Sequence, residues 1–146
     1  MKTVNKDKMA RQFTSALPFC KALKMNIEET GEAMAVLSMP YDPQIVGDPD
    51  TGVVHGGAVF ALMDTCAGAA IFMHPDSTMT TATIDLRIDY MRSATPGQRI
   101  FCRAEVFKAT RSVAFLRATA WDNDVDNTVA TATATFTFER PKGAGA

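Results

Sequence analysis

A single carboxylate interrupts an otherwise apolar stretch of the sequence. From His55 to Met73, Asp64 is the one side chain that carries a full charge, apart from any charge on the histidine. Moving a carboxylate into an apolar interior without partners costs several kcal/mol, so Asp64 must be paired, protonated or exposed in a cavity. Two interpretations are open: a structural carboxylate that caps the N–H groups of a neighbouring loop, or a catalytic general base or nucleophile.

A second group suited to chemistry lies just before this stretch. The run His55-Gly56-Gly57 precedes a predicted helix, and two residues without Cβ leave the first N–H groups of that helix open to an approaching atom. A helix N-terminus also carries about half a positive charge. The turn is therefore suited to hold a carbonyl oxygen that becomes negative during a reaction, as an oxyanion hole does, and a plain turn before a helix is the alternative.

The spacing of these two groups decides how they can share a reaction. Gly56 and Asp64 are eight residues apart, which along an α-helix is about 12 Å. A reacting atom must lie about 3 Å from both its base or nucleophile and its oxyanion donors, so one chain cannot supply both. Two central helices packed antiparallel about a two-fold axis would bring the N-terminus of each to the middle of the other. The sequence therefore predicts a homodimer with its site at the interface.

The periodicity of apolar residues predicts the scaffold that positions these groups. Helical spacing indicates a helix over residues 5–17, closed by Pro18, and a second helix over residues 58–73 that is apolar on nearly all sides and therefore buried. The prolines and glycines of residues 40–52 predict a long irregular loop. Strict alternation predicts a half-buried antiparallel strand over 81–91, and further strands are expected over 24–29, 33–39, 98–108, 113–122 and 128–139.

The last two predicted strands carry alanine at alternate positions. Short side chains let another element approach closely, and the buried helix is the candidate. The fold class is therefore α+β, with a curved six-stranded antiparallel sheet wrapped around a central helix and an extra N-terminal helix. We expect a single domain over residues 1–146, with its core at about 23–139 and a frayed tail at 141–146. The alanines are Ala118, Ala120, Ala130, Ala132 and Ala134.

Composition excludes several classes of protein. With 47% hydrophobic and 21% charged residues, the chain is typical of a globular domain rather than a disordered one. Balanced charge, 15 basic against 16 acidic residues, leaves no positive field for nucleic acid. No signal peptide pattern is found, and no apolar run reaches the roughly 18 residues that span a bilayer. Three widely spaced cysteines fit neither a disulfide set nor a metal site, so we expect a cytoplasmic protein without a bound metal.

Two motifs resemble a known family. The run Gly52-Val53-Val54-His55-Gly56-Gly57, followed by Leu62-Met63-Asp64 with the acid nine residues after the histidine, resembles the hot-dog-fold thioesterases. The phenylacetate-degradation-type (PaaI-like) acyl-CoA thioesterases are the most similar group. The segment 83–94 is similar to the strand that follows the helix in that family, and the resemblance covers residues from about 23 to 139.

This resemblance implies an enzyme that splits an acyl-CoA thioester into a carboxylic acid and coenzyme A, with no cofactor because coenzyme A is part of the substrate. Asp64 would be the catalytic carboxylate, the Gly56 N–H would polarise the thioester carbonyl, and His55 with Gly57 would shape the turn that presents it. Thr83 stands where the family often has Ser or Thr near the attacking water, although β propensity alone also explains a strand threonine. Homodimers, often paired as tetramers, are usual in the family.

The remaining expectations concern the substrate. Phe60 and Met63 would help to form the acyl pocket at the interface, and the N-terminal helix would cover it. Coenzyme A carries phosphates, so a few cations are needed near the entrance to the site. The candidates are basic residues near strand ends, with solvated surface charge as the alternative for each: Arg92, Lys108 and Arg111.

One position departs from the family pattern. Many members have an asparagine six residues before the histidine, where this chain has Pro49 between Asp48 and Asp50. Neither aspartate is an amide, so the positioning of water is expected to differ. This departure keeps open a second hypothesis, a non-catalytic acyl-CoA-binding module on the same scaffold. A third hypothesis is a hot-dog hydratase or dehydratase, but the chain lacks the histidine placement of those members.

Overall fold

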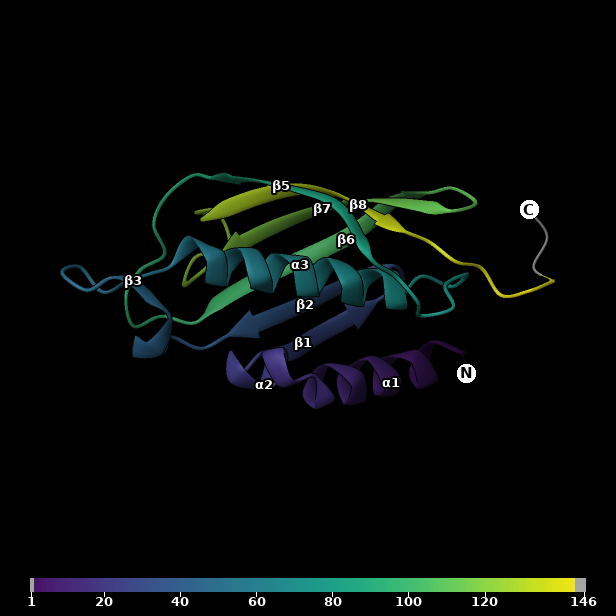
Figure 1. Ribbon diagram of the computed structural model, residues 1–146, viewed down its shortest axis with the longest axis horizontal. Helices are drawn as coiled ribbons and strands as arrows, with labels where there is room; N and C mark the ends of the chain where they lie inside the picture. Colours follow the sequence, from purple (N-terminus) through teal and green to yellow (C-terminus); the bar gives the residue numbers. More distant parts are fainter. Residues whose placement is uncertain (1, 144–146) are drawn as a thin grey trace.

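A six-stranded antiparallel sheet curves around one helix, α3 (Gly56–Phe72), in the computed structural model of the chain (Figure 1). The structure describes the backbone of residues 2–143 and the side chains of residues 5–143. The strand order is β1-β2-β6-β7-β8-β5, so the strand that follows α3 pairs with the last strand. The predicted α+β class is confirmed. The strands are β1 (Asn26–Gly31), β2 (Met34–Met39), β5 (Thr83–Tyr90), β6 (Ile100–Ala109), β7 (Val113–Trp121) and β8 (Ala130–Thr137).

Helix α3 is buried because its sequence is apolar on nearly every side. It begins two residues earlier than predicted, at Gly56, with His55 as its N-cap. Its inner side packs against β2, β6 and β7. The fully buried Cys66 donates its S–H to the carbonyl oxygens of Cys102 (3.2 Å) and Ala35 (3.4 Å). These contacts fix the helix relative to the sheet.

Alanines on β7 and β8 give the helix room. Ala118 pairs with Ala132 and Ala120 with Ala130 across the two strands, and all four side chains are more than nine-tenths buried. Interiors pack at high density, so small side chains on the sheet allow α3 to lie close to it. We call these four residues, together with Ala134 of β8, the alanine ladder.

Strand β5 forms an edge of the sheet and is more exposed than its sequence predicts. Alternation over 81–91 predicts a half-buried strand, but Ile84 is 57% and Tyr90 is 50% exposed. Leu86 and Ile88 are the residues of this strand that are partly buried. Within the described chain β5 pairs with β8 alone, so its outer edge is open. The prediction of half-burial is therefore wrong for a single chain, because a sequence pattern does not say what covers each face.

Two helices, rather than one, precede the sheet. The sequence predicts a helix over 5–17 that Pro18 closes, whereas α1 runs over Lys2–Ala16 and α2 over Pro18–Ala22. Proline lacks an N–H and its fixed φ suits the first turn of a helix, so Pro18 begins the second helix. Figure 1 shows both helices alongside β1, at the edge of the sheet opposite β5.

The segment between β2 and α3 is more regular than predicted. Within residues 40–52 the chain forms a 3-10 helix, η1 (Pro43–Ile45), and strand β3 (Val46–Asp48), which pairs with β4 (Val53–Val54). The His55 N–H donates to the Ile45 carbonyl at 2.8 Å and closes this β3–β4 ribbon onto the start of α3. Prolines and glycines therefore shape a short ribbon here instead of an irregular loop.

The other predicted strands lie within about two residues of their observed bounds. Of the predicted frayed tail, residues 144–146 lie outside the described residues, and the extent of the domain stays a prediction. Across residues 2–143, none of the helices is both long and apolar enough to cross a membrane.

Candidate active site

Asp64 is partly buried on α3 and faces the start of β5. Its Oδ1 atom accepts a hydrogen bond from the Thr83 hydroxyl at 2.7 Å. Thr83 is the first residue of β5, and the register of β5 against β8 shifts just after it. The partner of the carboxylate is thus a side-chain hydroxyl and not the loop N–H groups of the structural interpretation. The fold thus brings together the predicted catalytic carboxylate and the threonine that the resemblance places near the attacking water.

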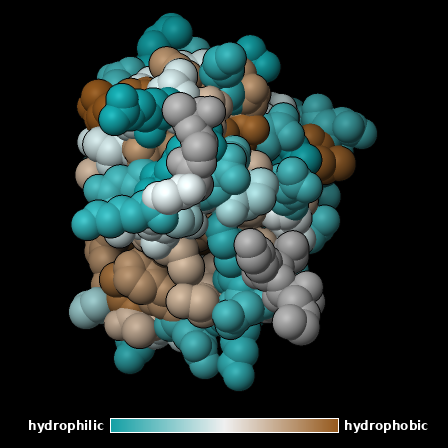
Figure 2. Space-filling model, turned by 90° about the vertical axis from the view of Figure 1, so that its right-hand side faces the viewer, coloured by the Kyte–Doolittle hydropathy of each residue, from teal (hydrophilic) through white to brown (hydrophobic). Residues whose placement is uncertain are grey.

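Asp64 and Thr83 form part of the wall of a cavity of about 420 Å³. Figure 2 views the end of the molecule where α3 ends and shows apolar side chains gathered on its lower part, near α1. A mostly apolar cavity with a few convergent polar groups is the usual form of a small-molecule site. The apolar part of the lining includes Phe13, Leu17, Gly68, Phe72, Met79 and Phe136.

The turn before α3 presents one free backbone donor. The Nδ1 atom of His55 accepts a hydrogen bond from the Gly57 N–H at 2.8 Å, and the Ala58 N–H donates to the His55 carbonyl. Because Nδ1 accepts, the neutral ring carries its proton on Nε2. Among residues 2–143, no acceptor contacts the Gly56 N–H. The sequence predicts that the N–H groups of both glycines are open. The prediction is wrong for Gly57, because its N–H donates to the His55 side chain.

Tyr90 and Gly47 support this turn, although the sequence analysis missed both. The Tyr90 hydroxyl donates to the Gly56 carbonyl at 2.7 Å. Partial burial raises the pKa of Tyr90, so the hydroxyl stays protonated at neutral pH. A Cβ at position 47 would lie 2.8 Å from the Cα of His55, so glycine is needed there. A strand aromatic and a loop glycine are too common to stand out in one sequence.

One chain does not bring the two halves of the predicted site together. Gly56 and Tyr90 line a cavity of about 390 Å³ near the start of α3, whereas Asp64 and Thr83 line the separate cavity of about 420 Å³. The helix between Gly56 and Asp64 is about 12 Å long. Within one chain, a thioester in contact with Asp64 is therefore out of reach of the Gly56 N–H.

The two predicted acyl-pocket residues of α3 lie in different environments. Met63 is fully buried in the hydrophobic core. Met63 therefore packs within the core of one chain, and its role as a substrate contact stays a prediction. Phe60 is 41% exposed, and its role as a substrate contact stays a prediction.

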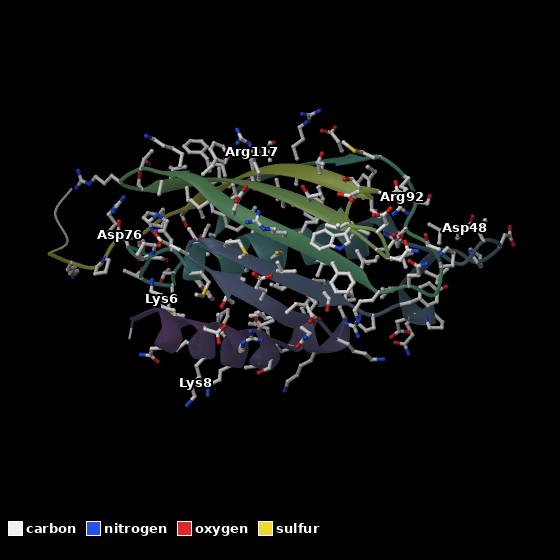
Figure 3. The ribbon with its side chains drawn as sticks, turned by 180° about the vertical axis from the view of Figure 1, so that it is seen from behind. Lys6, Lys8, Asp48, Asp76, Arg92 and Arg117 are labelled. Carbon is white, nitrogen blue, oxygen red and sulfur yellow. The ribbon has the colours of Figure 1, made fainter. Side chains whose placement is uncertain are left out.

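The predicted phosphate ligand Arg92 forms a structural ion pair, and its binding of phosphate stays a prediction. Its guanidinium binds both carboxylate oxygens of Asp122, at 2.6 and 2.9 Å, and donates to the Asn127 carbonyl at 2.8 Å. The Asp122 side chain is fully buried, and hydrogen bonding by Arg92 holds its pKa well below the ordinary value. Figure 3 shows Arg92 toward the end of the molecule that carries Asp48. Arg92 therefore ties the segment after β5 to the end of β7.

The other two predicted cations are exposed. Lys108 lies on β6, and Arg111 lies between β6 and β7. Arg111 lines a cavity of about 760 Å³ together with Lys142 and Arg140, and Arg140 pairs with Asp76 at 2.5 Å. Phosphate binding by Lys108 and Arg111 stays a prediction.

The departure at Pro49 lies in the turn of the β3–β4 ribbon. The Asp48 carboxylate accepts hydrogen bonds from the Thr51 hydroxyl (2.8 Å) and the Asp50 N–H (3.0 Å). These bonds hold the pKa of Asp48 below its ordinary value. Asp48 therefore shapes its own turn, while Pro49 and Asp50 are exposed.

Comparison with known proteins identifies the class of this chain as thioester hydrolase, as predicted. The chain belongs to the Thioesterase superfamily, whose family model matches residues 51–129, more than half of its length.

Individual relatives are similar to this chain in sequence or in fold. The medium/long-chain acyl-CoA thioesterase YigI of Escherichia coli K12 is 28% identical over 141 residues, covering 88% of this chain and 90% of the relative. A solved structure from Pseudomonas aeruginosa is 38% identical, with a TM-score of 0.78, and the match covers 89% of this chain and 96% of that one. The E. coli PaaI protein of the phenylacetic acid degradation operon shares the fold at 19% identity, with a TM-score of 0.82 and coverage of 94% and 96%. The predicted resemblance to PaaI-like hot-dog thioesterases is confirmed.

Thr83→Val is expected to lower kcat for thioester hydrolysis roughly tenfold, because a hydrogen bond to a charged group contributes about 1.5–3 kcal/mol. Valine keeps the shape of threonine but lacks the hydroxyl that binds Asp64. The readout is the free thiol released by the reaction. Thr83→Ser retains the hydroxyl and serves as the control. Equal losses in the two variants would show that the hydroxyl is not the group that matters.

Proposed function

We propose that this protein hydrolyses acyl-CoA thioesters at a site shared by the two subunits of a homodimer. The observation that carries the proposal is the Asp64 carboxylate, hydrogen-bonded to Thr83 on the wall of an apolar cavity. A carboxylate in this position is suited to activate water or to attack the carbonyl of an acyl group whose chain enters the cavity. The named activity of the E. coli relative, on medium- and long-chain acyl-CoA, supports the same substrate class.

The open edge of β5 and the open side of α3 support the dimer. Ile84 and Tyr90 on β5 and Phe60 on α3 are exposed apolar side chains. An unpaired edge strand is a template for pairing with another chain, and a two-fold contact uses the same patch on both subunits. Pairing of two β5 edges would cover these side chains and set two α3 helices side by side. In that arrangement, Gly56 of each subunit approaches Asp64 of the other.

The Gly56 N–H would hold the thioester carbonyl oxygen, where the N-terminus of α3 favours negative charge. In one route, Asp64 of the other subunit takes a proton from water, whose oxygen attacks the carbonyl carbon. The tetrahedral intermediate then expels coenzyme A thiolate, which takes up the proton. In the second route, Asp64 attacks directly, forms an anhydride and releases the thiolate, and water then hydrolyses the anhydride. Single turnover in oxygen-labelled water separates the routes, because only the second can place the label in Asp64.

A mixture of two inactive variants tests whether the site is shared. Asp64→Asn removes the carboxylate, and Gly56→Val blocks the backbone donor. If the site crosses the interface, a mixed dimer has one site with both substitutions and one site with neither. Equal mixing by co-expression would then restore about one quarter of the wild-type activity. A site within one chain would leave every site defective, and no activity would return.

Gly56→Ala is expected to lower kcat/KM at least about tenfold, because the methyl group stands beside the free N–H that would hold the developing oxyanion. The melting temperature should change little, since a Cβ at position 56 would lie 3.5 Å from the Tyr90 ring, an ordinary contact. Steady-state kinetics and thermal melting measure the two quantities. An unchanged kcat/KM would remove Gly56 from the proposed site.

A cytoplasmic location belongs to the same proposal. The three cysteines, all within the described residues, are free and buried: Cys20, Cys66 and Cys102. A reducing compartment keeps thiols in this state.

A further inference from the structure

Helix α1 closes the outer side of the cavity beside Asp64. Phe13 of α1 and Leu17, the residue that follows α1, line the cavity together with Gly68 and Phe72 of α3. The rings of Phe13 and Phe72 meet edge to face, with centroids 5.1 Å apart and an interplanar angle of 67°. The N-terminal helix is therefore part of the cavity wall.

Polar contacts with β1 hold α1 in this position. Arg11 donates to the Ile27 carbonyl at 2.7 Å, and the Thr30 hydroxyl donates to Asp7 at 2.5 Å. Hydrogen bonds from Thr30 and Arg11 also hold the pKa of Asp7 below its ordinary value, so the carboxylate is ionised at neutral pH. Phe13 therefore lies on a docked helix at the wall of the cavity, with 47% of its surface exposed.

The cavity follows α3 away from Asp64. Gly68 is about 6 Å and Phe72 about 12 Å further along the helix. A group of the size of a water molecule occupies about 30 Å³ in the liquid, so a cavity of about 420 Å³ holds on the order of ten methylene groups. Gly68 leaves the middle of this space open: among the described residues outside its own helical turn, the neighbour within 4 Å of a Cβ built there is the edge of the Phe136 ring, at 4.0 Å.

We propose that this cavity binds the acyl chain and that Gly68 and Phe13 set the permitted length, with unbranched aliphatic acyl groups of medium length as the substrate class. The inference rests on the proposed function, because that function places the thioester carbonyl at Asp64. From there the chain runs past Gly68 and meets the Phe13–Phe72 contact. A longer chain must displace this contact, so its hydrolysis is slower.

Two substitutions with opposite expected effects test the pocket. Gly68→Leu fills the middle of the cavity, and leucine favours helical backbone more than glycine does. We expect the ratio of kcat/KM for dodecanoyl-CoA to that for butanoyl-CoA to fall at least about tenfold, which is the discrimination a hydrophobic pocket makes for a misfitted methylene. Phe13→Ala removes the closing ring. It is expected to raise the ratio for hexadecanoyl-CoA over dodecanoyl-CoA about tenfold.

Met9→Ala is the matched control. Met9 is an exposed apolar residue one turn before Phe13 on α1 and is not part of the cavity lining. In the Met9→Ala variant, kcat/KM should depend on acyl-chain length as it does in the wild type. An equal loss of kcat/KM at every chain length in Gly68→Leu would overturn the proposal. An unchanged dependence of kcat/KM on chain length in Phe13→Ala would also overturn it.

A binding measurement separates this inference from the proposed function. S-alkyl-CoA thioethers of the same chain lengths bind without turnover. A selective loss of affinity for the dodecyl over the butyl thioether in Gly68→Leu supports the acyl pocket even if the wild type releases no thiol. Thiol release by the wild type, combined with unchanged thioether affinities in Gly68→Leu, would overturn the pocket and leave the proposed function standing.

Discussion

Replacing Asp64 with asparagine is expected to lower kcat for acyl-CoA hydrolysis at least about a hundredfold, because a positioned acid or base contributes typically about 10²–10⁴-fold. An amide neither takes the proton of water nor attacks a carbonyl. Asparagine has nearly the size of aspartate, and its amide oxygen can still accept the hydrogen bond from Thr83. The melting temperature should therefore stay near that of the wild type. Release of free thiol measures the rate.

Asp85→Asn is the matched control for this substitution. Asp85 is an exposed carboxylate two residues beyond Thr83 on the same edge strand. Its removal changes the charge of the chain by the same amount, but no effect on kcat is expected. Turnover by Asp64→Asn at the rate of this control would exclude the carboxylate from the reaction.

Arg92→Ala is expected to destabilise the fold by about 3–5 kcal/mol, because removing one partner of a buried ion pair leaves an uncompensated charge. The stranded group is the Asp122 carboxylate, whose side chain is fully buried. For a chain of this size, the loss lowers the melting temperature by roughly 10–15 °C. Thermal and urea unfolding measure it. Arg87→Ala is the control, since the Arg87–Asp89 pair is exposed on both sides and such pairs contribute about 0–1 kcal/mol.

The difference in stability between the wild type and Arg92→Ala should depend on pH through the titration of Asp122. Hydrogen bonding by Arg92 and by the backbone N–H groups of Thr95 and Asn123 depresses the pKa of the folded carboxyl. A depressed pKa contributes stability above the unfolded pKa of about 3.9, and the contribution is lost as the pH falls toward the folded value. The gap between wild type and Arg92→Ala should therefore be widest at neutral pH and narrow below about pH 4. A constant gap across this range would contradict the assignment.

The central helix and the carboxylate within it were predictable from the sequence. Apolar residues on nearly every side of residues 58–73 indicate a buried helix, and a lone acid such as Asp64 must then be paired, protonated or exposed in a cavity. The burial of the helix and the need of Asp64 for a partner both follow from the residue types of this one segment. Neither inference requires knowledge of the segments that pack against it.

The features that were missed depend on contacts between distant segments. The sequence shows that Arg92 is basic, but not that Asp122, 30 residues away, occupies its guanidinium. It shows the alternation of β5, but not that a single chain leaves this strand at an open edge. Likewise, Pro18 marks a helix boundary without saying that a second helix follows. Pattern and spacing identify elements and candidate groups, while their partners follow from the packed structure.

The alanine ladder links the thickness of the core to the geometry of the reaction. One methyl group added to Ala118 or Ala132 would have to push α3 outward, since both side chains are more than nine-tenths buried. The Asp64 carboxylate would move with the helix, while Thr83 on β5 would stay with the sheet. These small residues thus act as spacers for a pair of groups that they never touch. Substitutions at these alanines can therefore change the reaction rate and the substrate preference, although the alanines do not contact the acyl chain.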